Sequence, residues 1–408
     1  MKILFITLVD FRSIDDKNLY ADLMREFAKK GHDVFIVSPF ESRFKIEKEM
    51  IIEKTAGSEK QSTILKVKIG NIQKTNIIEK GISTILVEYQ ILAAVKKHFK
   101  DIRFDLVLYS TPPITIVKPI SFIRKRDKAK TFLMLKDIFP QNAIDLGMLT
   151  TTGLKGILSK MFRNKEKKLY QISDYIGCMS QANVDFLLKH NPQIAENKVS
   201  ICPNGIEVLE SMPDEDRKKE LRKKYGLSTD KTVFVYGGNL GKPQGIPFII
   251  ECLKQEANNE EAEFLIVGSG TEFEKLNAYI KENSPANVRL LSALPKEDYE
   301  QLVSACDVGL IFLDYRFTIP NFPSRLLSYM QSRIPVLAAT DKATDIGKII
   351  EQGNFGLSCS SDDVKQFSHC IERFVKSDNL KKLGENGYQY LLENYTVSNV
   401  YASIVEVL

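Results

Sequence analysis

KTVFVYGGNLGKPQGIP, residues 231–247, is the stretch that decides the fold of this chain. An apolar run, Thr232–Tyr236, opens directly into the glycine-rich segment Gly237–Lys242, and a helical pattern follows over Phe248–Lys254. A glycine-rich turn between a strand and a helix exposes backbone N–H groups and the positive end of a helix dipole, which suits a phosphate or diphosphate. The alternative is an ordinary tight connection. The rest of the chain has to distinguish the two.

Before this segment, short apolar runs alternate with helical patterns, as expected of βα units around a buried parallel sheet. The predicted strands are Ile3–Val9, Asp33–Ser38, Thr63–Ile69, Leu106–Ser110, Thr131–Leu135, Tyr175–Met179 and Val199–Cys202. The predicted helices are Asn18–Lys30, Ile77–Phe99, Leu154–Ser173 and Gln181–Lys189.

The alternation stops at Pro203-Asn204-Gly205, passes through a charged linker over 206–230, and then restarts. The second set of predicted strands is Thr232–Tyr236, Glu263–Val267, Val288–Leu291, Val308–Leu313 and Pro335–Ala338. At 408 residues the chain is long enough for two domains. We therefore predict α/β domains over 1–205 and 206–385, with a terminal helix, about 386–408, that returns to the first domain.

Composition is typical of a soluble globular protein, with 43% hydrophobic residues and no long uncharged apolar segment. The N-terminus, MKILFITLVDF, reads as a buried strand and lacks a signal-peptide cleavage site. The six cysteines are scattered without a CxxC pair, which favours reduced thiols in the cytoplasm over disulfides or a zinc site.

Charge is distributed unevenly along the chain. Residues 1–205 hold 34 Lys+Arg and 22 Asp+Glu, a net charge of +12. The remaining residues hold 23 Lys+Arg and 30 Asp+Glu, a net charge of −7. Basic clusters lie at Arg124–Lys130 and Arg163–Lys168. They are either solvated helix faces or a surface attracted to anionic lipid. Nucleic-acid binding is disfavoured, because the clusters lack interleaved aromatics and no known nucleic-acid module is visible.

Ligands of parallel α/β sheets bind at the carboxyl ends of the strands. After the first strand come Asp10, Phe11 and Arg12, in a long polar turn. After Thr131–Leu135 come Lys136 and Asp137, followed by an aromatic residue and a proline. We interpret both segments as walls of a cleft, although capping of the following helix would also explain Asp137.

In the second half, Gly268-Ser269-Gly270 forms another strand-to-glycine turn. It is not a full GxGxxG motif, because Phe273 takes the last glycine position, so a dinucleotide-binding fold is disfavoured. A helix is predicted with Ser324 as its N-cap residue and Arg325 in its first turn. An arginine is unfavourable at that end of a helix. Either a bound anion compensates for it, or its side chain points into solvent.

Metal chemistry is not expected. The four histidines lie far apart, and Asp214-Glu215-Asp216, which fits a DxD motif, begins a helix where acids complement the dipole. No Ser/His/Asp arrangement or G-x-S-x-G motif is present.

Taken together, these segments resemble a known family, the retaining GT-B-fold glycosyltransferases of family 4, over essentially the full length of the chain. The resemblance rests on Ser180 with Cys202–Ile206, on Gly237–Gly245, on Gly268–Gly270, on Asn287–Leu291, and on Pro323–Met330 before Pro335–Leu337. Together with Lys136–Gln141, the combination is most similar to the capsule and O-antigen branch, which includes N-acetylfucosamine transferases.

The resemblance implies two Rossmann-like domains with parallel sheets facing across a cleft. The C-terminal domain would bind a nucleotide sugar, expected to be UDP-linked. The N-terminal domain would bind a lipid-linked (polyprenyl diphosphate) saccharide at the inner membrane face. No cofactor and no metal are expected, because basic side chains and a helix N-terminus neutralise the leaving diphosphate. The product would be a capsule or O-antigen polysaccharide, extended by an N-acetylated amino or deoxyamino sugar. The protein would be cytoplasmic and peripherally attached to the membrane.

The resemblance also assigns site residues. Lys136 and Asp137 are the expected catalytic residues, and Asp10, Phe11 and Arg12 the expected acceptor contacts. The expected donor contacts are Gly238, Asn239, Leu240, Gly241, Lys242, Gln244, Gly268, Ser269, Gly270, Ala293, Leu294, Ser324, Arg325, Leu326 and Ser328.

The chain departs from the family pattern at several positions. The usual Arg and Lys after the first strand of the second domain fall at Asn239 and Gln244, and the usual pair of glutamates falls at Pro320 and Ser328. Two alternatives therefore stay open: a sugar-nucleotide 2-epimerase of the same architecture, which the few histidines disfavour, and a non-catalytic partner subunit, which the missing glutamates suggest.

Overall fold

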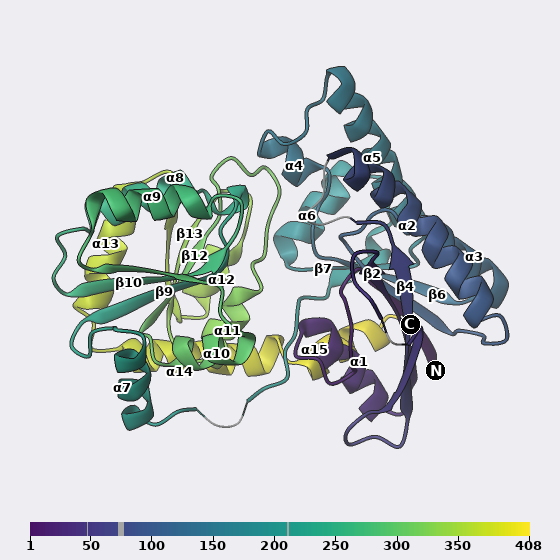
Figure 1. Ribbon diagram of the computed structural model, residues 1–408, viewed down its shortest axis with the longest axis horizontal. Helices are drawn as coiled ribbons and strands as arrows, with labels where there is room; N and C mark the ends of the chain where they lie inside the picture. Colours follow the sequence, from purple (N-terminus) through teal and green to yellow (C-terminus); the bar gives the residue numbers. More distant parts are fainter. Residues whose placement is uncertain (47, 72–76, 210–211) are drawn as a thin grey trace. The chain divides into compact units, whose positions relative to one another are not determined.

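The computed structural model describes residues 1–46, 48–71, 77–209 and 212–408. Two compact units divide the chain: the first is Met1–Ile206 together with Val397–Leu408, and the second is Glu207–Thr396 (Figure 1). The first crossing between the units therefore lies one residue after the predicted boundary at 205.

Each unit contains one sheet, built from the strands β1 (Lys2–Ile6), β2 (Asp33–Glu41), β3 (Met50–Lys54), β4 (Gln61–Ile69), β5 (Leu106–Ser110), β6 (Lys130–Leu135), β7 (Tyr175–Cys178), β8 (Val199–Ile201), β9 (Thr232–Asn239), β10 (Ala262–Ser269), β11 (Val288–Ser292), β12 (Val308–Phe312), β13 (Val336–Thr340) and β14 (Gly356–Ser360). The helices are α1 (Leu19–Lys29), α2 (Ile77–His98), α3 (Val117–Asp127), α4 (Gln141–Asp145), α5 (Gly153–Ile172), α6 (Gln181–His190), α7 (Glu215–Lys224), α8 (Ile246–Gln255), α9 (Phe273–Asn283), α10 (Lys296–Ser304), α11 (Arg325–Gln331), α12 (Ile346–Gln352), α13 (Val364–Val375), α14 (Leu380–Asn394) and α15 (Val397–Val405).

The first unit has an eight-stranded sheet in the order β3-β4-β2-β1-β5-β6-β7-β8. Its strands pair in parallel except for β3, which pairs antiparallel with β4 at the edge. The central strands are continuous apolar runs because helices cover both faces of the sheet. Without β3, the order is that of a doubly wound Rossmann-type sheet, in which the order reverses between β1 and β5.

The second unit repeats this topology with a six-stranded parallel sheet in the order β11-β10-β9-β12-β13-β14. Here the order reverses between β9 and β12. Ligands of doubly wound sheets bind at the carboxyl ends of the strands beside such a reversal. The glycine-rich segment at the end of β9 therefore lies where a ligand is expected.

The C-terminal helices belong to different units. Helix α14 packs on α11 in the second unit, whereas α15 packs on α1 in the first. The Tyr401 ring in α15 lies 4.8 Å from that of Phe27, and its hydroxyl lies 2.9 Å from Nε2 of His32. The prediction that the returning segment begins at about 386 is corrected to Val397, because residues up to Thr396 pack within the second unit.

Two further properties concern the helices and the cysteines of the described residues. None of their helices combines the length and the apolar character that crossing a bilayer requires. All six cysteines are buried as free thiols.

Candidate functional site

Strand β9 extends further than its sequence pattern indicates. Gly237 and Gly238 continue the strand, in register with Val267 and Gly268 of β10, and the turn begins only after Asn239. The predicted phosphate turn is therefore shorter than the glycine-rich segment.

The glycines in this region permit a close approach of two backbones. A Cβ atom at Gly268 would lie 2.0 Å from the carbonyl oxygen of Gly238, a distance that no side chain tolerates. Gly238 itself has a φ of +131°, which disfavours any residue with a side chain. These two glycines are explained by the packing of β9 against β10, and the N–H groups beyond them have to be considered one by one.

Hydrogen bonds within the protein already use two N–H groups of the turn. Leu240 N–H donates to the Ser269 carbonyl oxygen at 2.9 Å, and Gly241 N–H donates to Oε1 of Gln244 at 3.2 Å. The same Oε1 accepts from Nδ2 of Asn239 at 3.1 Å. Gln244 thus stabilises the turn from within, and the two N–H groups are occupied by protein acceptors.

Arg325, the first residue of α11, reaches the end of β9 from the segment that follows β12. Its Cζ atom lies 4.1 Å from the ring centroid of Tyr236, and its Nη2 atom would lie 3.2 Å from a Cβ at Gly238. Its Nη1 atom is buried and has no hydrogen-bond partner among the described residues. A buried guanidinium N–H without an acceptor is costly, and an anion at the strand end would satisfy it.

Tyr236 contacts both Arg325 and the turn after β9. Its ring stacks on Arg325, and its hydroxyl donates to the carbonyl oxygen of Asn239 at 2.7 Å, the residue at which the turn begins. Two further tyrosines lie beneath: a Cβ at Gly237 would meet the Tyr299 hydroxyl, and the Tyr329 hydroxyl donates to the Leu310 carbonyl oxygen at 2.9 Å. Sequence reasoning did not single out these tyrosines.

The other predicted donor contacts lie at or near the carboxyl edge of the same sheet but differ in accessibility. The exposed residues are Asn239, Lys242, Ser269, Gly270, Ala293 and Ser324. The half-buried ones are Leu294 and Ser328, and the buried ones are Leu240, Gly241 and Leu326. The leucine side chains at 240 and 326 belong to the core, so a ligand could meet those residues only through their backbone. Ser324 is the N-cap residue of α11, as predicted, and its side chain makes no capping hydrogen bond.

In the first unit, the segment after β1 is held by two residues that sequence reasoning missed. Lys66 of β4, whose side chain is 4% exposed, pairs with Asp10 and donates to the Phe11 carbonyl oxygen at 2.7 Å. Ser38 of β2 accepts from the Phe11 N–H at 2.8 Å. The Phe11 side chain is fully buried in the core, which leaves only its backbone for an acceptor. Arg12 is exposed, and its Nε lies 3.7 Å from Oδ2 of Asp10.

Lys136 and Asp137 follow β6, and the structure separates their environments. The Lys136 ammonium donates to the carbonyl oxygens of Cys202 and Pro203, both at 3.1 Å, and burial lowers its pKa. Lys136 therefore anchors the segment that leaves the first unit, and its predicted catalytic role stays a prediction.

The Asp137 backbone is fixed while its carboxylate is not engaged. The Asp137 N–H donates to Oγ1 of Thr111 at 3.2 Å, and the Thr111 hydroxyl donates to the Asp137 carbonyl oxygen at 2.9 Å. No described residue donates a hydrogen bond to its carboxylate, and burial raises the pKa of Asp137 to about 6. A carboxyl group with a pKa near neutrality can accept a proton from a substrate.

The acidic cluster of the linker has a structural explanation. Asp214 caps α7, because its carboxylate accepts from the Arg217 N–H at 2.8 Å. Across the described ranges, no group of three or more His, Cys, Asp or Glu residues could hold a metal ion.

The chain is thus a two-domain α/β protein with two doubly wound units. At the strand-order reversal of the second unit lies Arg325, whose Nη1 has no acceptor in the described part of the chain, an arrangement suited to a phosphorylated ligand. Comparison with known families gives two matches: Glycosyltransferase Family 4 over residues 18–208, and Glycosyl transferases group 1 over residues 217–390. The chain belongs to the GT-B glycosyltransferases of this combined type.

Individual relatives agree with this assignment. The "Probable glycosyltransferase WbjE" of Pseudomonas aeruginosa is 25% identical over 324 residues, which cover 79% of this chain and 78% of WbjE. Among solved structures, sucrose-phosphate synthase from Thermosynechococcus elongatus has a TM-score of 0.75 at 13% identity, covering 100% of this chain and 98% of that one.

Two further structures cover the chain almost completely. HepE from Anabaena, solved with UDP and glucose, has a TM-score of 0.71 at 15% identity, with 100% and 98% coverage. WaaG, a glycosyltransferase involved in lipopolysaccharide biosynthesis, has a TM-score of 0.64 at 15% identity, with 99% of each chain covered. At such identities the structures establish the fold.

Proposed function

We propose that this protein is a retaining glycosyltransferase of capsule or O-antigen polysaccharide synthesis. It transfers a sugar, N-acetylated amino or deoxyamino in type, from a UDP-linked donor to a lipid-linked saccharide acceptor. The observation that carries the proposal is Arg325 beside Gly238 at the end of β9, since its buried Nη1 finds no acceptor in the residues that the structure describes. The UDP complex of HepE and the lipopolysaccharide role of WaaG support the donor and product classes by analogy.

In this proposal the second unit binds the donor. Arg325 neutralises the diphosphate as it leaves, and Lys242, which is exposed in the turn after β9, adds a second cation. Ser328 offers a hydroxyl where the family pattern has a ribose-binding glutamate, so its contact would be weaker than that of a carboxylate. The first unit binds the acceptor near Asp10, Arg12 and Asp137.

A panel of nucleotide sugars, incubated with the purified protein with and without a lipid-linked acceptor, tests the proposal. A transferase releases nucleoside diphosphate rapidly only when the acceptor is present. A 2-epimerase would change the donor sugar without any acceptor, and a non-catalytic subunit would do neither.

Removal of divalent metals is expected to leave the transfer rate unchanged. The expectation rests on Arg325 and Lys242, which supply the positive charge that a metal would otherwise bring to the diphosphate. Turnover is measured in EDTA and after addition of Mg²⁺ or Mn²⁺. A loss in EDTA that either metal restores would contradict the expectation and would direct attention to Asp214 and Asp216.

Loss of the Tyr236 ring is expected to weaken donor binding. A cation–π contact is worth about 0.5–2 kcal/mol, so Tyr236→Leu should raise the donor KM about 2- to 30-fold. Tyr236→Phe keeps the ring but removes the hydroxyl bond to Asn239, so it should have a smaller effect. Donor KM and UDP affinity are the measurements.

Tyr388→Leu is the matched control for Tyr236→Leu. It removes a ring that stacks on Arg333 at 4.0 Å, a similar contact that is not part of the proposed donor site. Equal effects of the two leucine variants on UDP affinity would indicate a general loss of stability instead of a specific role for Tyr236.

A further inference from the structure

Helices α2, α3 and α5 form one layer over the sheet of the first unit, and α3 packs against both of the others (Figure 1). Two contacts fix their register. Lys165 of α5 donates to Oε1 of Glu88 in α2 at 2.7 Å, and the Lys118 ammonium of α3 lies 4.1 Å from the ring centroid of Tyr89 in α2. The three helices therefore present a joint outer surface, called here the helical face.

Large apolar side chains are exposed on the helical face. In α2 they lie within about one helical turn of Glu88, and in α5 they lie about two turns before Lys165. They are Ile85 (46% exposed), Leu86 (45%), Tyr89 (48%), Ile157 (69%) and Leu158 (37%). Side chains of this kind that gather on neighbouring helices indicate an interaction surface more often than scattered ones do.

The exposed charges that the structure describes on the helical face have one sign. Among the described side chains of these helices, the carboxylates are those of Glu88, Asp127 and Glu166, which are at most 5% exposed and paired with cations. The exposed charged residues are all cations: Lys96, Lys97, Lys118, Arg124, Lys125, Lys155, Lys160, Lys167 and Lys168. Of these, Lys97 and Arg124 contact carboxylates from outside the three helices.

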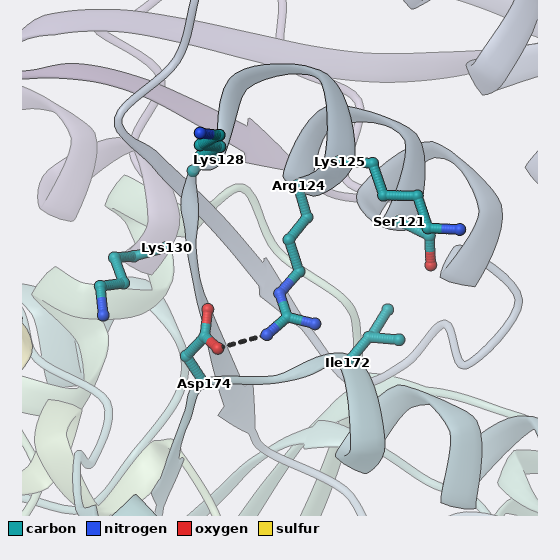
Figure 2. A pocket seen from close by; sticks show the side chains of 8 residues that line it. Ser121, Arg124, Lys125, Lys128, Lys130, Ile172 and Asp174 are labelled. Atoms are coloured by element: carbon teal, nitrogen blue, oxygen red, sulfur yellow. Dashed lines mark hydrogen bonds and ion pairs between the residues drawn. The ribbon is translucent and has the colours of Figure 1, made fainter.

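The cationic part of the surface extends beyond the end of α3. A hollow of about 490 Å³ is lined there by Arg124, Lys125, Lys128, Lys130 and Asp174, among others, and Asp174 pairs with Arg124 at 2.7 Å. Figure 2 shows these cations around the opening. The lysines complement the negative end of the helix dipole, and they also enlarge the positive field of the helical face.

We propose that the helical face docks on an anionic lipid bilayer, with Leu86 and Ile157 entering the interface and the surrounding lysines contacting the headgroups. The proposal rests on the proposed function, which places the acceptor lipid in a membrane. Charge decides the occupant. A second copy of this face would oppose cations to cations, whereas anionic headgroups complement them and the acyl boundary accommodates the apolar side chains. The interaction therefore has a salt-sensitive part and a salt-resistant part.

Vesicle binding of the full chain, without donor or acceptor, tests the proposal separately from enzymatic activity. Vesicles of phosphatidylcholine alone are compared with vesicles that also contain phosphatidylglycerol. Each lysine near an anionic surface contributes about a fivefold factor, so the triple variant Lys118→Gln, Lys155→Gln, Lys160→Gln should weaken binding on the order of a hundredfold. The matched control replaces three exposed lysines elsewhere in the first unit, Lys2→Gln, Lys189→Gln and Lys198→Gln, and should lose much less.

The apolar part has its own test. High salt screens exposed charges beyond a few ångströms. Residual binding of the natural chain in high salt should therefore disappear in Leu86→Ser with Ile157→Ser, and should persist in Ile52→Ser, which changes an exposed residue of β3. The chain contains no tryptophan. Leu86→Trp thus provides a single reporter, whose emission should shift to the blue on anionic vesicles, while that of Ile52→Trp should not.

Several results would overturn the proposal. One is absence of binding to anionic vesicles at low salt, and another is binding that the helical-face variants and their controls reduce equally. Concentration-dependent dimers that Leu86→Ser with Ile157→Ser dissolves would show that a second copy covers the face. If the variants lose vesicle binding but retain transfer to a short, water-soluble acceptor, the docking surface is supported independently of the chemistry. If the natural chain binds vesicles but transfers nothing, the proposed function fails and the docking surface stands.

Discussion

Arg325→Ala should lower kcat/KM about 10- to 100-fold without unfolding the protein. The guanidinium lies beside Gly238 at the strand-order reversal of the second unit, and its buried Nη1 has no acceptor among the described residues. A charge-assisted hydrogen bond to a phosphate is worth about 1.5–3 kcal/mol, and each 1.4 kcal/mol corresponds to a factor of ten in rate. Arg325→Lys keeps the charge but loses the planar contact with Tyr236, so an intermediate loss is expected.

The control for Arg325 is Arg333, the second residue after the end of the same helix. Its guanidinium stacks on Tyr388 at 4.0 Å and pairs with Glu385 at 3.1 Å, so a carboxylate of the protein already neutralises its charge, although its Nε, like Nη1 of Arg325, has no hydrogen-bond partner among the described residues. Arg333→Ala should lower thermal stability more than UDP affinity, and Arg325→Ala should do the reverse. If Arg325→Ala keeps full activity and full UDP affinity, the diphosphate binds elsewhere.

The alternation of apolar runs and helical patterns was sufficient to predict two parallel α/β units, because strands covered on both faces are apolar at nearly every position. β5, β12 and β13, for example, are buried throughout. The missed strands lack this pattern. β3 is a half-exposed edge strand, and β14, with the sequence GLSCS, carries few apolar residues. Only the register with their neighbours identifies them as strands.

The position of Arg325 in the first turn of a helix was predicted from the sequence, and its role in donor binding stays a prediction. Arg325 could be found because a cation in the first turn of a helix is locally unfavourable, which pointed to an external anion. Tyr236 could not be found in this way, because in the sequence it is an ordinary aromatic residue of a buried strand. Its contact with Arg325 joins positions 89 residues apart, and only the adjacency of β9 and β12 brings them together. Lys66 was missed for the same reason: its function is a hydrogen bond to a loop that another strand positions. Gln244 was expected as a donor contact, whereas in the structure its Oε1 accepts hydrogen bonds from within the turn.

The glycine-rich segment shows the opposite error. Its glycines suggested a loop open to phosphate, but Gly237 and Gly238 continue β9, and the N–H groups of Leu240 and Gly241 are bonded within the protein. A run of glycines indicates that the backbone closely approaches another group, which can be a ligand or a neighbouring strand. Whether that partner is a ligand or a neighbouring strand depends on pairing that the sequence does not display.

The largest effect is expected at Asp137, if its carboxylate accepts the proton of the acceptor hydroxyl. In that case Asp137→Asn, which keeps the shape and removes the charge, should lower kcat by about 10²- to 10⁴-fold. If the leaving phosphate takes the proton instead, as in the retaining mechanism of the resembling family, Asp137 only positions the acceptor. The loss should then be smaller and should appear mainly in KM for the acceptor.

The pH profile separates these two roles. Burial raises the pKa of Asp137 to about 6, so the carboxyl group is protonated below that pH and ionised above it. A base must be ionised to act, so kcat should fall about tenfold for each pH unit below the pKa, and Asp137→Asn should remove this limb. Asp145→Asn, a nearby carboxylate that accepts from Gln141, is the control and should keep the natural profile. A stable Asp137→Asn enzyme with full activity and the natural pH profile would exclude both roles, and the half-buried Asp137 would then serve only the local structure after β6.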